Sequence, residues 1–222
     1  DLLVIDKPSG VLSQGTVDPK REHISSLLQK QLNCEVFLHH RLDKDTSGIM
    51  IFALSKKANP GLTEMFRQHT VKKTYLSICK INRIPEEKEF TVRNFLAPVR
   101  SPEKKMMRMV SVKKGGWEAI TDFKILDANN EFAFIEAKPK TGRTHQIRIH
   151  LAEMKLPILG DPLYGGKSSL VPRTMLHAYS LDFQHPVTQA HMSVRCPLPQ
   201  DMKKVLENLK FKSDFASVEA SE

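Results

Sequence analysis

The 222-residue sequence has few cysteines, few aromatic residues and no long apolar run. Its three cysteines, Cys34, Cys79 and Cys196, lie too far apart for a zinc knuckle or a redox motif, so we expect buried free thiols in a reducing compartment. No apolar stretch approaches the ~20 residues that cross a bilayer, and no signal peptide is visible, which predicts a cytoplasmic protein without a membrane partner. Because the chain begins at Asp1, without Met and inside a strand-like run, we expect an N-terminal segment to be missing.

Several motifs that define large enzyme classes are also missing. The sequence contains no Gly-x-x-x-x-Gly-Lys loop, no dinucleotide-binding fingerprint and no Gly-x-Ser-x-Gly elbow. In contrast, positive charge is abundant, with a net charge of +9 and a pI of about 9.5. Such a surplus favours a polyanionic partner through counterion release, although charge alone does not decide for nucleic acid.

Apolar periodicity along the chain predicts an α+β protein. We expect helices at 19–32, 60–70 and 144–154 and after Asp201. Strands are expected at 2–5, 49–54, 73–79, 119–126, 131–138, 178–183 and 191–196. The stretch 82–118 is less regular and predicts short strands with a mobile basic loop between Lys104 and Lys114. Frequent hairpins with helices between them indicate one domain with a mixed sheet, residues 1–210, followed by a polar tail at 211–222.

The first chemically dense segment is His40-Arg41-Leu42-Asp43, followed by Thr46-Ser47-Gly48. Cations, carboxylates and hydroxyls gather here directly before a buried strand, which is where a site would be built. A solvated turn, in which the polar side chains bond their own backbone, explains the same composition.

The second segment runs from Thr141 to His150. Gly142 permits a tight turn, Thr144 is the expected N-cap, and His145 and Arg148 project from the polar side of the first turn. Arginine near a helix N-terminus suits a phosphate or a carboxylate, but an ordinary amphipathic helix has the same pattern.

Neither these histidines nor the next loop predicts a metal site. His145 and His150 are five residues apart, which is not a zinc spacing. The Gly- and Pro-rich loop 157–165 is expected to be a structural turn.

Together these segments resemble the RluA-type RNA pseudouridine synthases over about residues 1–196. The resemblance rests on six ordered motifs: Asp6-Lys7-Pro8-Ser9-Gly10; His40-Arg41-Leu42-Asp43 with Thr46-Ser47-Gly48; Phe66-Arg67 with Lys73-Thr74-Tyr75; Gly142 to Arg148; Ile158-Leu159-Gly160-Asp161; and Leu176-His177-Ala178. It implies a bent, mostly antiparallel mixed sheet with flanking helices and a central catalytic cleft that holds RNA. It also implies conversion of uridine to pseudouridine without cofactor or metal.

The resemblance also assigns catalytic roles. Asp43 is the nucleophile at the sugar or the base that starts elimination, and Arg148 pairs with it, an arrangement that typically lowers a carboxylate pKa by ~1–3 units. Tyr75 stacks on the uracil and helps with the proton at C5.

The remaining residues implied by the resemblance bind substrate. Leu176 covers the base, and Arg41 fills the gap left by the flipped nucleotide. Lys7 and Arg143 are expected phosphate contacts, and His145 is placed with them in the substrate-binding set.

The partner expected from the resemblance is RNA, ribosomal rather than transfer RNA, bound by a monomer. The basic stretch Lys104 to Lys114 is expected to determine substrate choice; the alternative interpretation is a solvated loop without that role.

Two departures from the family stand out: Ser13-Gln14-Gly15 replaces a frequent His-Pro-Gly stretch, and no separate S4-type RNA-binding domain is present. A catalytically silent RNA-binding or ribosome-assembly protein is the alternative, and a metal-dependent nuclease is disfavoured by the histidine spacing.

Overall fold

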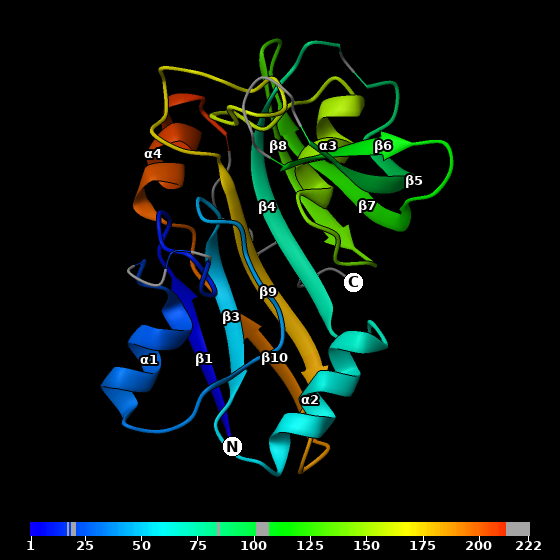
Figure 1. The fold of residues 1–222 in the computed structure, drawn as a ribbon. Helices are drawn as coiled ribbons and strands as arrows, with labels where there is room; N and C mark the ends of the chain where they lie inside the picture. Colours follow the sequence, from blue (N-terminus) through cyan, green and yellow to red (C-terminus); the bar gives the residue numbers. More distant parts are fainter. Residues whose placement is uncertain (17, 19–20, 84, 101–106, 212–222) are drawn as a thin grey trace.

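The computed structural model describes residues 1–222 except 17, 19–20, 84, 101–106 and 212–222 (Figure 1). The polar tail expected at 211–222 therefore lies outside the described residues, apart from the buried Phe211. Among the described helices, none combines the length and apolar character needed to span a membrane.

The described strands join into one mixed sheet, as the sequence predicted. Its main path is β1-β3-β9-β4-β8-β7-β5-β6, with β2 paired to β3 and β10 paired to β9. Among the pairings between the described strands, only the β3–β9 contact is parallel, and it is short. The strands are β1 (Leu2–Lys7), β2 (Phe37–Leu38), β3 (Ser47–Ala53), β4 (Lys72–Lys80), β5 (Glu89–Arg100), β6 (Met107–Val112), β7 (Trp117–Ala128), β8 (Phe132–Pro139), β9 (Leu176–Gln184) and β10 (His191–Arg195).

Helices pack beside both halves of this sheet (Figure 1). They are α1 (Ile24–Leu32), α2 (Ala58–Arg67), α3 (Gln146–Glu153) and α4 (Gln200–Asn208). α2 contacts β3, whereas α3 contacts β6 and β7. The long strands β4 and β9 run through the centre and connect the two halves (Figure 1).

Apolar burial explains the central strands. Every residue of β3 is buried, as its continuous apolar run predicts for a strand covered on both faces. The largest core cluster combines residues of β4, β8 and β9 with Leu151 of α3 and with Met202 and Leu206 of α4. Leu176 belongs to the same cluster, so the start of β9 is anchored by packing.

Two expected elements differ from the structure. The first helix begins at Ile24, because His23 forms its N-cap: His23 Nδ1 accepts the Ser26 amide at 3.3 Å, and Ser26 Oγ accepts the His23 amide at 3.3 Å. In the stretch 82–118, β5 is a long strand rather than a short one, because it pairs with β6 on one side and β7 on the other. The mobile basic loop expected between Lys104 and Lys114 is wrong for 107–112, which form β6. Long-range pairing of this kind leaves little local signal in a sequence.

The cysteines are free, as expected, but Cys34 is exposed rather than buried. Cys34 follows the left-handed C-cap residue Asn33 of α1, where the chain turns at the surface. Cys79 and Cys196 are buried.

Candidate active site

Asp43 lies in the loop between β2 and β3, and this loop is fixed from the N-terminal segment. Ser13 Oγ donates to the Leu42 carbonyl at 2.7 Å and accepts the Leu42 amide at 3.0 Å. The Gly10 amide and the Lys7 ammonium both donate to the Lys44 carbonyl. The Asp6–Gly10 motif therefore supports the loop that carries Asp43.

Arg148 contacts Asp43, as the resemblance implied. Its Nη1 donates to Asp43 Oδ2 at 2.9 Å, although 105 residues separate the two. Arg148 projects from the first turn of α3 into the interior rather than from a polar outer face, and its side chain is only 8% exposed. A buried guanidinium requires anionic partners, and Asp43 is one of them.

Asp161 is the second partner of Arg148 and is fully buried. Arg148 Nε donates to Asp161 Oδ2 at 2.7 Å, and Nη2 donates to Oδ1 at 2.9 Å. This fork leaves Nη1 directed at Asp43. Burial opposes the charge of Arg148, but the bonds to Asp161 and the charges of Asp161 and Asp43 outweigh it and raise the pKa of Arg148.

Sequence reasoning gave Asp161 no role beyond a turn. The turn is present, because Asp161 Oδ1 accepts the amides of Leu163 and Tyr164. The available signal was an aspartate two residues after the apolar run Leu156 to Leu159, since a carboxylate at a buried position needs a cationic or hydrogen-bonding partner.

His145 faces the same carboxylate from the side of α3. Its Nε2 lies 3.7 Å from Asp43 Oδ2, and its Nδ1 lies 2.8 Å from the Tyr164 hydroxyl. Burial lowers the pKa of His145 despite the opposing charge of Asp43, so the imidazole is neutral at pH 7. Arg148 also lies over the Tyr164 ring, 5.1 Å from its centroid, and Arg108 lies over it at 5.0 Å.

The N-terminus of α3 differs from the expectation. Its N-cap is His145, with φ of 57°, and not Thr144. The side chain of Gln146 replaces the cap by closing the preceding loop: its Oε1 accepts Thr141 Oγ1 at 2.8 Å and the Arg143 amide at 3.0 Å. Its Nε2 donates to the Ile120 carbonyl at 3.0 Å, which ties the loop to β7.

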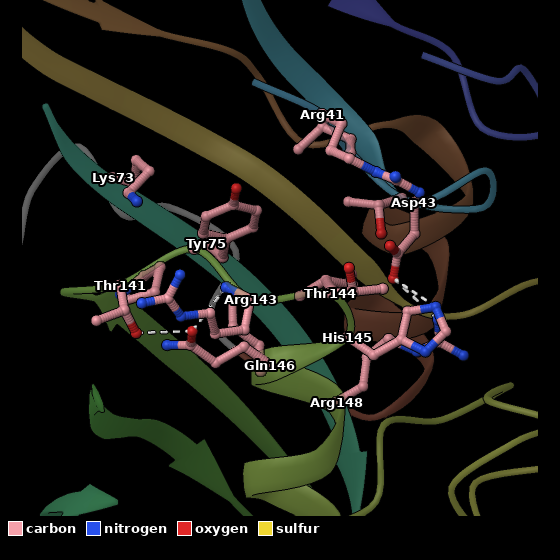
Figure 2. A pocket seen from close by; sticks show the side chains of 16 residues that line it. Arg41, Asp43, Lys73, Tyr75, Thr141, Arg143, Thr144, His145, Gln146 and Arg148 are labelled. Atoms are coloured by element: carbon pink, nitrogen blue, oxygen red, sulfur yellow. Dashed lines mark hydrogen bonds and ion pairs between the residues drawn. The ribbon is translucent and has the colours of Figure 1, made fainter. Parts of the chain in front are cut away.

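A pocket of about 110 Å³ brings most of the predicted residues together. Figure 2 shows Asp43, Arg148 and His145 on one side of it and Lys73, Thr141 and Arg143 across from them, with Tyr75 between. The predicted residues that line this pocket are Arg41, Asp43, Tyr75, Arg143, His145, Arg148 and Leu176. Lys73, Thr141 and Gln146 also line it and were not predicted.

Tyr75 and Leu176 form apolar parts of this lining. They belong to β4 and β9, which pair side by side. Burial and the nearby charge of Asp43 raise the pKa of Tyr75, so its hydroxyl remains protonated at neutral pH. The pocket thus offers a ring face, an apolar side chain and a carboxylate to one small planar group.

Lys7 does not fit the predicted phosphate contact. Its side chain is fully buried, and its ammonium donates to the carbonyls of Pro8 at 2.9 Å, Val11 at 2.9 Å and Lys44 at 3.1 Å. All three donors of the ammonium are thereby engaged by backbone. Lys7 instead holds the loop that carries Asp43, and burial lowers its pKa to about 8.

Arg173 is a second buried cation that supports the site and was not predicted. Its guanidinium is held by Asp201 of α4, with Nε 2.6 Å from Oδ2 and Nη2 2.9 Å from Oδ1. Its Nη1 donates to the Asp45 carbonyl at 3.3 Å, in the Asp43 loop, and to the Thr174 carbonyl at 3.0 Å. Arg173 therefore connects the Asp43 loop with the segment that leads into Leu176.

No group of three or more His, Cys, Asp or Glu side chains is arranged to hold a metal ion within the described part of the chain. His150 is buried between Thr121 Oγ1 at 3.0 Å and Asn94 Oδ1 at 2.9 Å. Burial lowers its pKa to about 4, so it is a neutral core histidine.

Comparison with known proteins agrees with this geometry. Residues 1–153 match the model of a family described as RNA pseudouridylate synthase. YhcT of Bacillus subtilis (strain 168), named an uncharacterized RNA pseudouridine synthase, is 35% identical over 92% of this chain and 68% of its own length. The ribosomal large subunit pseudouridine synthase D of Xanthomonas campestris pv. campestris is 32% identical over 94% of this chain and 67% of its own length.

Solved structures of similar fold carry related names. Human RNA pseudouridylate synthase domain containing 4 superposes with a TM-score of 0.75 at 26% identity, covering 95% of this chain and 90% of that chain. Human RNA pseudouridylate synthase domain containing 1 superposes with a TM-score of 0.71 at 25% identity, covering 96% of this chain and 93% of that chain. This chain belongs to the RNA pseudouridylate synthase family, whose members isomerise uridine in RNA.

Proposed function

We propose that this enzyme converts uridine to pseudouridine in large-subunit ribosomal RNA, with Asp43 as the catalytic carboxylate. The observation that carries the proposal is the 2.9 Å contact between Arg148 Nη1 and Asp43 Oδ2 in a pocket that Tyr75 also lines. Support for the RNA class comes from relatives named ribosomal large subunit pseudouridine synthase D.

Asp43 starts the reaction at the ribose. The bond between N1 of uracil and C1′ must break, the base must turn, and a new bond must form between C5 and C1′. Asp43 acts either by adding to C1′ or by removing a proton from the sugar to start elimination, and both routes use an ionised carboxylate. Arg148 compensates the negative charge at 2.9 Å and holds the carboxylate in one orientation.

Tyr75 and Leu176 hold the detached base while it turns. A planar uracil can stack on the Tyr75 ring, and Leu176 covers it from β9. After the new bond forms, C5 carries a proton that must leave. N1, which has lost its bond to C1′, must gain one. The Tyr75 hydroxyl, which lines the same pocket as Asp43, relays this proton by donating its own as it accepts another.

Arg41, Arg143 and His145 bind the RNA around the base. Flipping a nucleotide out of a helix costs a few kcal/mol, and the exposed guanidinium plane of Arg41 is suited to fill the vacated stack. Arg143, whose Nε donates to the Glu118 carbonyl at 3.0 Å, retains donors for a phosphate. His145 closes the pocket next to Asp43.

A catalytically silent RNA-binding protein is not favoured. A binder of phosphates has no use for a carboxylate in its binding pocket, because Asp43 repels the RNA backbone. The fork from Asp161 through Arg148 to Asp43 orients that carboxylate, which is a requirement of chemistry rather than of binding.

The test is pseudouridine mapping of ribosomal RNA from cells that lack the protein, complemented with wild type or with Asp43→Asn. We expect one or more sites to lose pseudouridine in the deletion, to regain it with wild type and to stay unmodified with Asp43→Asn. Restoration by Asp43→Asn would show that another residue is the catalyst, and an unchanged ribosomal map in the deletion would reject the proposed substrate.

Three further expectations stay predictions. They are action as a monomer, a cytoplasmic location, and substrate choice by the basic stretch Lys104 to Lys114. Part of that stretch, 104–106, lies outside the described residues. Of its described cations, Lys113 and Lys114 are exposed between β6 and β7 and are available to RNA.

A further inference from the structure

A groove of about 1170 Å³ opens beside the catalytic pocket and has no role in the chemistry described above. We call it the flanking groove; it is formed by the end of α2, the start of β4, the end of β8, and β9 with β10. Lys73 and Pro139 line both this groove and the catalytic pocket, so the two are continuous. Small-molecule sites typically occupy ~300–1,000 Å³, so a space of this size next to the site suits a longer ligand.

Positive side chains outnumber negative ones in the flanking groove. Its cations are Lys72, Lys73, Lys138, Lys140 and Arg195, and its carboxylates are Glu64, Asp122 and Asp182. Several of these charges are already paired: Asp122 with Lys140 at 2.9 Å, Glu64 with its helix neighbour Arg67, and Lys138 with Glu136, which lies outside the lining, at 2.9 Å. The remaining balance favours a polyanion over an acidic or neutral small molecule.

Lys73 is the cation at the junction of the two spaces. It belongs to β4, two residues before Tyr75, so both side chains leave the same face of the strand about 7 Å apart. Its Nζ lies over the backbone of Gly142, 3.9 Å from where a Cβ of that residue would be. Figure 2 shows Lys73 across the pocket from Asp43, on the side of Thr141 and Arg143.

The surroundings of Lys73 contain cations rather than an acidic partner. Burial lowers its pKa to about 8, and no carboxylate of the described residues lies within ion-pair distance of its ammonium. His69 lies at the edge of the flanking groove, and its pKa is lowered first by burial and then by the positive charges of Lys73 and Arg143. Lys73 and Arg143, which both line the catalytic pocket, form a site for an anion that arrives from outside.

We propose that the RNA strand on one side of the target uridine runs through the flanking groove, and that Lys73 binds the phosphate nearest the flipped nucleotide. This inference rests on the proposed function and names the part of the substrate that the groove receives. Lys72, exposed on the neighbouring position of β4, contacts the strand further along. The phosphate at Lys73 fixes the register of the strand, so that the adjacent nucleotide is the one placed against Tyr75.

The experiment measures binding of an unmodified transcript of large-subunit ribosomal RNA as a function of KCl concentration. Asp43→Asn is the parent protein, so that no turnover occurs, and Lys73→Gln, Lys73→Arg and Lys72→Gln are added to it. Lys204→Gln is the matched control, because Lys204 is an exposed lysine of α4 that lines neither space.

We expect Lys73→Gln to weaken binding about 5- to 10-fold at low salt and to reduce the slope of log K against log[KCl] by ~0.7–0.9, the value for one lost phosphate contact. Lys73→Arg keeps the slope, Lys72→Gln lowers it, and Lys204→Gln leaves it unchanged. Because Lys72 is exposed, Lys72→Gln carries the test if Lys73→Gln fails to fold.

Wild-type affinity and slope in both Lys73→Gln and Lys72→Gln would overturn the inference. The wild-type protein is assayed in parallel for pseudouridine formation on the same transcript. If wild type modifies the transcript but binding does not depend on Lys73 or Lys72, only the proposed role of the groove is rejected. If binding depends on Lys73 but wild type does not modify the transcript, the proposed function is rejected and the groove remains an RNA-binding site.

Discussion

Asp161 holds the guanidinium of Arg148 through two hydrogen bonds, of 2.7 and 2.9 Å, and so directs its remaining nitrogen at Asp43. The two residues are only 13 positions apart, but Arg148 belongs to α3 and Asp161 to the loop after it. A buried carboxylate that does not line the pocket thereby orients Asp43, the proposed catalytic carboxylate. Asp161 is a positioning residue in this arrangement.

Replacement of Asp161 tests that role. Asp161→Asn keeps the shape of the side chain but removes the charge and one acceptor of the fork. We expect the free energy of unfolding to fall by about 2–3 kcal/mol, because a buried charged hydrogen bond is lost. At a temperature where the variant is folded, we expect kcat to fall at least 10-fold while KM for RNA stays within twofold.

Urea unfolding and steady-state kinetics on the same preparation provide both values. Lys204→Gln serves as the surface control, with unchanged stability and kinetics. An equal loss in kcat and in RNA affinity would point to general damage of the pocket rather than to lost orientation of Arg148.

Tyr75→Phe separates the ring of Tyr75 from its hydroxyl. The ring, which is proposed to stack on the base, is kept, so we expect RNA affinity to change less than twofold. The proton transfer at C5 loses its assistant, and a positioned acid–base group typically contributes 10²–10⁴-fold, so kcat should fall by about that factor. Single-turnover kinetics with saturating protein measure the step directly, and a Tyr75→Phe rate equal to wild type would remove the hydroxyl from the mechanism.

The buried ammonium of Lys7 should make the free energy of unfolding depend on pH. Burial lowers its pKa from 10.5 to about 8 in the folded protein, so between pH 8 and 10.5 the unfolded chain binds more protons than the folded one. Stability therefore rises with pH across this window, and below pH 8 the cost of the buried charge is fully present. Relative to Lys7→Met, wild type should gain roughly 1–3 kcal/mol between pH 8 and 10.5.

Denaturant unfolding of both proteins at pH 7.5, 9 and 10.5 provides this difference. The comparison cancels the titration of the other lysines, because these are common to both chains. A difference that stays constant over the three pH values would mean that the Lys7 ammonium keeps its proton through this range.

Replacement of Arg41 should affect modification of the RNA substrate but not the stability of the protein. It is exposed and lines the pocket beside Asp43, so Arg41→Ala should change the free energy of unfolding by less than ~0.5 kcal/mol. Its guanidinium is proposed to fill the gap left by the flipped base, so modification of a structured RNA should slow at least 10-fold. A short single-stranded RNA with the same target needs no flipping and should be modified at nearly the wild-type rate; equal losses on both RNAs would contradict the proposed role.

Particular residues show how much of the candidate site could be predicted from the sequence. Asp43, Arg148, Tyr75 and Leu176 were identified as a set by resemblance, and the structure places them around one pocket. Lys7 was assigned to phosphate because a lysine beside a glycine-containing turn carries no local sign of burial, and only the fold wraps three carbonyls around it. Asp161 and Arg173 were overlooked for the related reason that their partners lie elsewhere in the chain.

The sequence by itself determined the elements whose signal is local. The uninterrupted apolar run of β3 and the alternation in β4 indicated these two strands, frequent hairpins with helices between them indicated a mixed sheet, and the ordered motifs indicated the family. Tertiary structure decided what depends on contacts between distant segments: the length of β5, which pairing on both sides extends, and the left-handed cap at His145. It also decided the charge network, because a buried ion pair is defined by which two side chains meet, and Arg148 meets Asp43 across 105 residues of sequence.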